Sequence, residues 1–123
     1  MIYLATKYSD PDPEMQEYNY RLALSYANKL MQQFPELNVY SSIIHYHDLA
    51  QSYGLPTDAS FWELRNHGMI LLSEAVYVAQ TFSWQKSKGV ISEIAFAEKN
   101  GIAVKYVRHN IDKGFLELFD ESN

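Results

Sequence analysis

The sequence predicts an α/β sandwich with a mostly parallel sheet of four or five strands. Short apolar runs alternate with amphipathic helical stretches along the 123 residues. The apolar runs are apolar at consecutive positions, which is typical of strands covered on both faces. The length suits one domain, which we expect to span residues 1–123, and a hydrophobic share of 47% is enough for its core.

Composition and charge argue against several classes of function. A net charge of −5 disfavours proteins that bind the nucleic-acid backbone, because they need a basic face. The chain has no Cys, which excludes disulfides, thiolate metal sites and Cys nucleophiles. No apolar run approaches the roughly 18–20 residues of a membrane span, and residues 1–6 lack the basic start of a signal peptide. We therefore expect a cytoplasmic protein with no nucleic-acid or membrane partner.

The N-terminal third of the chain predicts a strand, a helix and a second strand. Residues 2–6 are a short apolar run of strand-forming side chains, followed by a polar loop. Asp12 and Pro13 then fit a helix start, with Asp as the cap and Pro at the first helical position. Apolar side chains at steps of three and four predict a helix over residues 14–34, and residues 37–41 are the second predicted strand.

The remainder of the chain continues this alternation. Residues 42–58 are predicted to be a long loop with one helical turn at most, and a helix follows over residues 61–72. The later predicted elements are a strand over residues 74–80, a helix over residues 89–99 and a strand over residues 102–107. Phe115, Leu118 and Phe119 form an apolar stripe in the tail, which docks either on its own sheet or on a second copy of the chain.

Parallel α/β sheets bind ligands at the carboxyl ends of their strands. The predicted topology therefore brings four segments together there: residues 7–12, 41–47 and 81–87, and the tail after Val107.

The segment that enters the helix over residues 89–99 is the most informative part of the sequence. Backbone N–H groups there, with Ser87 and Gly89, sit where a helix N-terminus binds an anion. Glu93 follows about one turn later, a polar residue among apolar ones, and the helix dipole favours its ionised form. An ionised Glu beside a sugar-phosphate site is what a glycosyl-transfer nucleophile needs. The alternative is that Glu93 only stabilises the start of the helix.

Histidines provide a second set of candidate site residues. His45 and His47 are two residues apart in the predicted loop, so they share one side of an extended chain. With Asp48 they are potential metal ligands, but further ligands are missing, so we favour hydrogen bonds to a sugar or phosphate and predict no metal. Asn66 and His67 lie within a predicted helix, where the simplest interpretation is a solvated face.

Several enzyme motifs are missing from the sequence. It contains no Walker loop, no glycine-rich dinucleotide motif, no nucleophile elbow and no zinc-protease motif. Triphosphate hydrolysis, hydride transfer and zinc proteolysis therefore have no support, and we expect no cofactor.

Four groups of residues carry a resemblance that spans roughly residues 2–107. They are residues 2–5 with 8–13, residues 41–47, residues 53–58 with 61–62, and Trp84, Ser87, Gly89, Val90, Glu93, Ala95 and Ala97. Jointly they resemble a small family of uncharacterised bacterial and phage proteins that belongs with the nucleoside 2-deoxyribosyltransferase-like superfamily.

The resemblance implies a flavodoxin-like three-layer sandwich with a pocket for a nucleoside or nucleotide. Glu93 matches the Glu that attacks the anomeric carbon of the sugar, and Tyr8 matches the Tyr that positions this nucleophile or the sugar. Ser87 and Gly89 match the residues that hold the 5′ group. The superfamily usually has an Asp in the helix before the third strand to assist the leaving base. Its place falls here near Asn66 or His67.

The sequence thus favours a nucleoside or nucleotide N-glycosidase, or a deoxyribosyltransferase-like protein, with Glu93 as nucleophile and Tyr8 as its positioner. A protonated His67, or Asn66, would take the place of the acid. The expected substrate-binding residues are Ser41, His45, His47, Trp84, Ser87, Gly89 and Ser92. The alternatives are a non-catalytic nucleotide-binding or sensing module and a structural interaction protein. We also expect a homo-oligomer, either a dimer or a tetramer.

Overall fold

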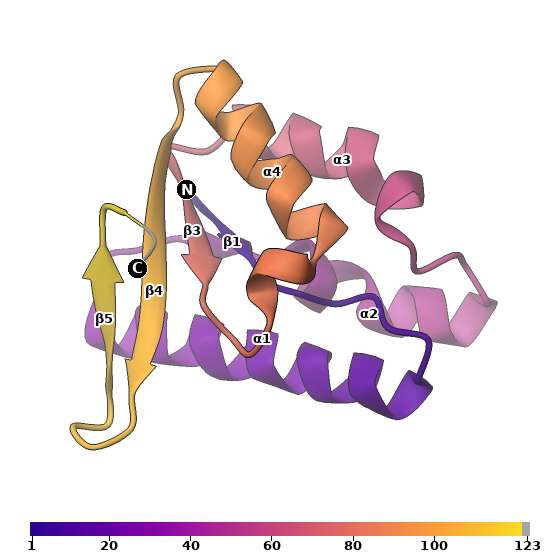
Figure 1. Cartoon of the computed structure of the whole chain (residues 1–123), viewed down its shortest axis with the longest axis horizontal. Coiled ribbons are helices and arrows are strands. Elements are labelled where there is room, and N and C mark those ends of the chain that lie inside the picture. The colour runs from indigo at the N-terminus through magenta and orange to yellow at the C-terminus, as the bar shows by residue number, and fades with distance from the viewer. Residues whose placement is uncertain (122–123) are drawn as a thin grey trace.

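A single five-stranded sheet organises residues 1–121, the part of the chain that the computed structural model describes. Its strands are β1 (Ile2–Ala5), β2 (Val39–Tyr40), β3 (Ala75–Ala79), β4 (Ala103–Asn110) and β5 (Phe115–Phe119). The order across the sheet is β2-β1-β3-β4-β5 (Figure 1). Neighbouring strands pair in parallel except β5, which is antiparallel to β4. The prediction of a mostly parallel sheet is confirmed.

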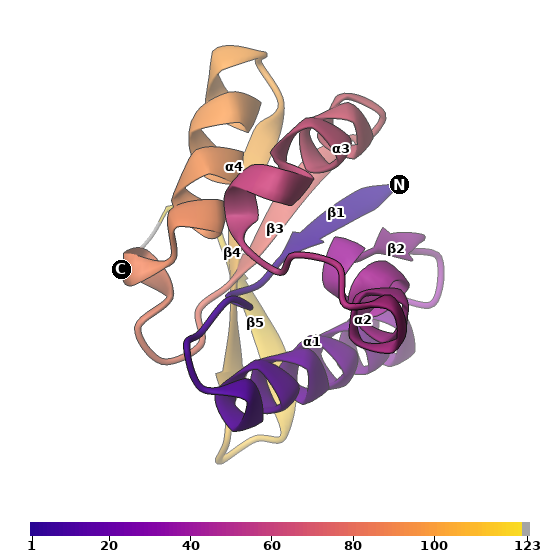
Figure 2. The same ribbon diagram turned by 90° about the vertical axis from the view of Figure 1, so that its right-hand side faces the viewer.

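Helices cover both faces of this sheet. In the described residues they are α1 (Pro13–Gln33), α2 (Ser42–Tyr53), α3 (Ala59–Leu71), the short 3-10 helix η1 (Trp84–Lys86) and α4 (Lys88–Lys99). α1 lies on one face, whereas α3 and α4 lie side by side on the other (Figures 1 and 2). α2 lies beside α1, near β2 (Figure 2). The molecule therefore has an α/β fold that is compatible with a three-layer sandwich.

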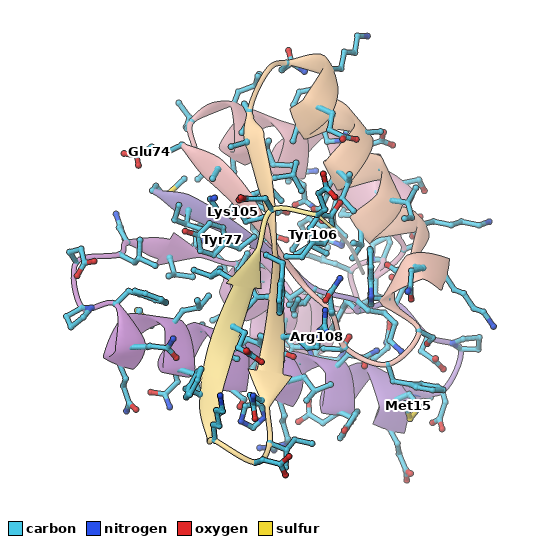
Figure 3. The ribbon with its side chains drawn as sticks, turned by 60° about the vertical axis from the view of Figure 1, so that its left-hand side comes forward. Met15, Glu74, Tyr77, Lys105, Tyr106 and Arg108 are labelled. Carbon is cyan, nitrogen blue, oxygen red and sulfur yellow. The ribbon has the colours of Figure 1, made fainter. Side chains whose placement is uncertain are left out.

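Side chains of the sheet alternate between two apolar cores. In β1, Ile2 and Leu4 pack with Leu30 of α1, whereas Tyr3 packs on the opposite face with Ile70 of α3. All four side chains of β1 are buried, as expected for a strand covered on both sides. β4 alternates in the same way, and Figure 3 shows Tyr106 on the side of that strand toward α4. One consequence is that the hydroxyl of Tyr3 lies inside the protein.

The starts of α1 and α4 agree with the sequence prediction. Asp12 accepts a hydrogen bond from the N–H of Glu14, and Pro13 is the first residue of α1. Ser87 caps α4 by accepting from the N–H of Val90. Both helices begin within one residue of the predicted position because each cap is encoded locally.

Residues 42–58 differ from the prediction of a long loop, because α2 occupies Ser42–Tyr53. Ser41 caps this helix through a hydrogen bond from the N–H of Ile44. Gly54 ends it in the left-handed conformation, with φ of 66°, which Gly adopts without steric cost. These two caps were overlooked, and they turn a predicted loop into three turns of helix.

The apolar tail is strand β5 rather than a one-sided stripe. Leu116 and Leu118 pack into the core under α1, whereas Phe119 packs into the core on the opposite face. Leu118 and Phe119 of the predicted stripe therefore dock on the chain's own sheet, whereas Phe115 is exposed. Contact with a second copy stays a prediction. Within residues 1–121, no helix has the length and hydrophobicity that a membrane crossing requires.

Candidate functional site

A cavity of about 510 Å³ opens at the carboxyl end of β1, and we call it the main cavity. Its lining comes from β1 and the segment after it, from α2, from the start of α3 and from the start of α4. Three of the four segments expected at this edge contribute to it. The fourth does not, because β4 continues past Val107 to Asn110 and turns back into β5. Described residues after Val107 therefore do not line the cavity.

Glu93 lines the main cavity from the second turn of α4 although its side chain is only 7% exposed. The hydroxyl of Tyr3 donates a hydrogen bond to its Oε2, and the side chain of Asn66 also hydrogen-bonds to it. Burial raises the pKa of Glu93 to about 7, while the bonds from Tyr3 and Asn66 act in the opposite direction. The sequence predicts that the helix dipole favours the ionised form of Glu93, but the loss of hydration on burial outweighs that effect and raises the pKa.

Tyr3, not Tyr8, is the tyrosine that holds Glu93. Its hydroxyl lies between Oε2 of Glu93 and Oγ of Ser42, the latter at 3.2 Å. Burial, followed by the nearby Glu93 carboxylate, raises the pKa of Tyr3 well above its usual value, so Tyr3 remains a donor. A tyrosine buried in a central strand needs a partner for its hydroxyl, and that requirement is the signal that the sequence analysis missed.

Asn66 lies at the position where an acid was sought, and it faces the main cavity from α3. Its Oδ1 is buried and has no hydrogen-bond partner among the described residues. The hydroxyl of Thr6, which follows β1, is also buried without a hydrogen-bond partner among the described residues, and Thr6 is 6% exposed. Buried polar atoms rarely remain unpaired, and both of these atoms belong to residues that line the main cavity.

His67 and Ser92 do not reach the main cavity. They line a second cavity between α3 and α4, which the main cavity adjoins at Glu93 and Asn66. The ring of His67 stacks on Phe96 with 3.9 Å between centroids, and its Nε2 lies 3.4 Å from Oγ of Ser92. The structure therefore places neither residue where we expected it, since successive residues of a helix point in different directions.

The start of α4 forms one end of the main cavity. Ser87 and Gly89 both line it, together with Lys86 and Lys88. A side chain at position 89 would bring its Cβ to 3.3 Å from the Cβ of Ala59, so Gly89 permits the close approach of α3. Helix N–H groups with two lysines nearby form a favourable environment for an anion.

His47 lies on the opposite wall and belongs to a hydrogen-bonded chain. Its Nδ1 is 2.8 Å from the hydroxyl of Tyr8, and its Nε2 is 2.8 Å from Oε2 of Glu17 on α1. Tyr20 stacks on the imidazole ring with 3.9 Å between centroids. Tyr8 and His47 line the main cavity, and burial raises the pKa of Tyr8. Tyr8 is therefore bonded to His47, and the sequence analysis gave no hint of Glu17.

Three other residues that we expected in the site, His45, Ser41 and Trp84, do not line the main cavity. His45 is exposed and lies beside Tyr40, because residues two apart on a helix face different sides. Ser41 caps α2 and does not line the main cavity, whereas Ser42 does. Trp84 is 7% exposed and packs in the core under α4, with its ring 5.7 Å from that of Tyr106.

An aromatic wall completes the main cavity. Tyr46 of α2 and Trp62 of α3 stack with 4.7 Å between centroids, and both line the cavity. The indole N–H of Trp62 donates to the carbonyl of Pro56, which fixes the ring. These rings offer an apolar flank suited to a planar ligand.

Comparison with family models and curated proteins identifies no relative, so the function of the site is inferred from its geometry. No protein-family model matches this sequence, and no curated protein matches it either. Within residues 1–121, no group of three or more His, Asp or Glu side chains is placed to hold a metal ion.

Proposed function

We propose that this chain is a nucleoside 2-deoxyribosyltransferase-like protein that cleaves the N-glycosidic bond of a nucleoside or nucleotide by hydrolysis or transfer. The observation that carries the proposal is the carboxyl group of Glu93. It is buried, bonded to two uncharged side chains and open to a cavity that ends in a helix N-terminus.

The chemistry follows from this placement. Breaking an N-glycosidic bond leaves positive charge on the sugar, and an adjacent carboxylate stabilises that charge and captures the anomeric carbon. The bond from Tyr3 fixes the carboxyl group of Glu93 in one orientation. Because burial raises its pKa to about 7, the carboxyl group of Glu93 exchanges between its ionised and protonated forms near neutral pH, and the ionised form is the nucleophile. Water or a second base then releases the sugar.

The remaining cavity walls suit the other parts of a nucleotide. The 5′ group would lie at the start of α4, near Ser87, Gly89 and the two lysines. The base would lie against Tyr46 and Trp62. A volume of about 510 Å³ is within the usual range for small-molecule sites.

The topology gives further support to the proposal. The strand order 2-1-3-4-5 is that of flavodoxin-like sheets, which bind ligands at the carboxyl ends of their strands. The antiparallel β5 departs from this pattern, but it lies at the edge of the sheet away from the main cavity.

The test is release of free base from nucleosides and nucleoside 5′-monophosphates, measured by chromatography. Glu93→Gln should reduce release by at least ~10³-fold, because the nucleophile acts only in the bond-breaking step. Glu98→Gln, on an exposed position of the same helix, is the matched control and should retain the activity. Full release by Glu93→Gln would contradict the proposal.

A non-catalytic nucleotide-binding module is the second candidate, and Asn66 favours it. An amide cannot donate a proton to a leaving base as a carboxylic acid does. In that case nucleoside monophosphates would raise the melting temperature of the protein without any release of base. The structural interaction protein that we also considered would show neither effect.

A further inference from the structure

Tyr8, His47 and Glu17 form a hydrogen-bonded chain of side chains, which reaches the main cavity from the wall opposite α4. Tyr8 follows β1, His47 is on α2 and Glu17 is on α1, so three separate elements build it. His47 is 6% exposed, whereas the side chain of Glu17 is 45% exposed and lies 3.4 Å from Arg21. The chain therefore runs from the solvent-exposed surface, through a buried imidazole, to a hydroxyl at the cavity.

The hydrogen bonds define how this chain handles a proton. The carboxylate of Glu17 only accepts, so Nε2 of His47 carries a hydrogen in both protonation states. When His47 is neutral, its Nδ1 accepts and Tyr8 donates to it. When His47 is protonated, Nδ1–H donates to the Tyr8 oxygen, and the Tyr8 hydrogen is free to point into the cavity. Tyr20 stacks on the ring of His47, and the uncharged side chain of Gln51 hydrogen-bonds to the hydroxyl of Tyr8.

The carboxyl and amide side chains of the main cavity do not offer a proton to a leaving base, and Lys86 and Lys88 lie at the start of α4, where the 5′ group is proposed to bind. Besides Glu93, the only carboxyl group among its described lining residues is Asp58. The hydroxyl of Ser60 donates to Asp58 and lowers the pKa of that exposed group, so it stays ionised at neutral pH. Asn66 occupies the position where an acid was sought and has no acidic proton.

We propose that Tyr8 is the group that protonates the leaving base, with His47 and Glu17 as positioning residues that supply the proton; this rests on the proposed N-glycosidase or transferase function. As the bond from the anomeric carbon to the base nitrogen breaks, its electron pair stays on the base. The Tyr8 hydrogen moves to the base, the Nδ1 hydrogen of His47 moves to the Tyr8 oxygen, and Glu93 bonds to the sugar. Tyr8 and His47 then accept the proton of the water that releases the sugar, which restores the starting state.

The experiment compares two leaving groups on the same sugar 5-phosphate. One probe is the natural nucleoside 5′-monophosphate that the wild type cleaves, and the other carries 4-nitrophenol in place of the base. Nitrophenolate leaves without a proton, so its first turnover does not need an acid. Tyr8→Phe should slow release of the natural base by roughly 10²- to 10⁴-fold but leave the first turnover of nitrophenol within about tenfold of wild type. Tyr18→Phe, at an exposed position of α1, is the control.

Glu17→Gln tests the positioning role of the outer residue. It should slow release of the natural base more than the first turnover of nitrophenol, as Tyr8→Phe does. ¹⁵N NMR of the neutral imidazole should show the Nε2–H tautomer of His47 in the wild type and a mixture of tautomers in Glu17→Gln. A merely structural role for Glu17 would leave the tautomer unchanged.

The outcomes separate the two proposals. Equal slowing of both probes by Tyr8→Phe would show that Tyr8 only binds the sugar, and it would overturn the proton-delivery role while the function of Glu93 stands. Absence of cleavage of either probe by the wild type would overturn both proposals. Selective slowing of the natural base supports both.

Discussion

The two helical walls of the main cavity hold equally buried ionisable side chains in opposite surroundings. On the α4 wall, Glu93 contacts only uncharged partners, Tyr3 and Asn66. On the α2 wall, His47 contacts Glu17, whose carboxylate reaches solvent. The carboxyl group is thus insulated from charged side chains, whereas the imidazole is hydrogen-bonded to a carboxylate that reaches solvent. The difference teaches that burial alone does not assign a role: a nucleophile gains from isolation, and a proton donor needs a route for exchange.

The largest expected effect concerns Glu93 on the α4 wall and is a change in the free energy of unfolding with pH. Burial raises the pKa of Glu93 from 4.5 to about 7. Because this pKa is higher in the folded than in the unfolded chain, the stabilisation is complete below pH 4.5 and is lost as pH rises through 7. The loss amounts to about 3 kcal/mol in the free energy of unfolding. Glu93→Gln lacks this titration, so its stability relative to wild type should increase by that amount between pH 4.5 and 8.

Urea unfolding at several pH values measures this prediction. Glu98→Gln provides the control, since the exposed residue 98 of the same helix should follow the wild-type curve. If the curves of wild type and Glu93→Gln run parallel from pH 4.5 to 8, Glu93 is not insulated, and the contrast between the two walls disappears.

The next effect concerns the hydrogen bond from Tyr3 to Glu93. This bond lowers the pKa of Glu93, so Tyr3→Phe should raise that pKa further and reduce the ionised fraction at neutral pH. We expect base release at pH 7 to fall about tenfold, or about 1.4 kcal/mol in the barrier, and to recover in part at higher pH. The pH profile of base release by wild type and Tyr3→Phe measures this shift in the pKa of Glu93. An unchanged midpoint would show that Tyr3 does not tune the nucleophile.

The contrast between the walls also explains what could be predicted from sequence. The α4 wall follows from local signals, because a serine cap and a glycine precede a run of apolar residues at helical spacing. The α2 wall was missed because its first turns carry Ile43, Ile44 and Tyr46, which are equally typical of a strand. Treating the segment as extended placed His45 and His47 on one side, whereas the helix separates them.

Long-range partners were beyond the reach of sequence patterns. Tyr3 and Glu93 are 90 residues apart, and His47 and Glu17 are 30 residues apart. A spacing rule relates residues on one element, whereas these pairs depend on how β1, α1, α2 and α4 meet at one edge of the sheet. Chain order did predict that edge, since residues 7–12, 41–47 and 81–87 all contribute to the cavity. It did not indicate which tyrosine would face which acid.

The smallest expected effect compares the two serine caps. Ser41 and Ser87 each accept a hydrogen bond from the N–H three residues later, at 3.2 and 3.3 Å. Replacing either by Ala should lower the free energy of unfolding by about 1 kcal/mol. Only Ser87 also lines the main cavity, so only Ser87→Ala should weaken the binding of a nucleoside monophosphate, by several-fold in calorimetry. Ser41→Ala is the matched control, since it removes the same kind of cap from the other wall. Equal weakening by both variants would mean that α2 and α4 hold the ligand in the same way, and the 5′ group would then not lie at the start of α4.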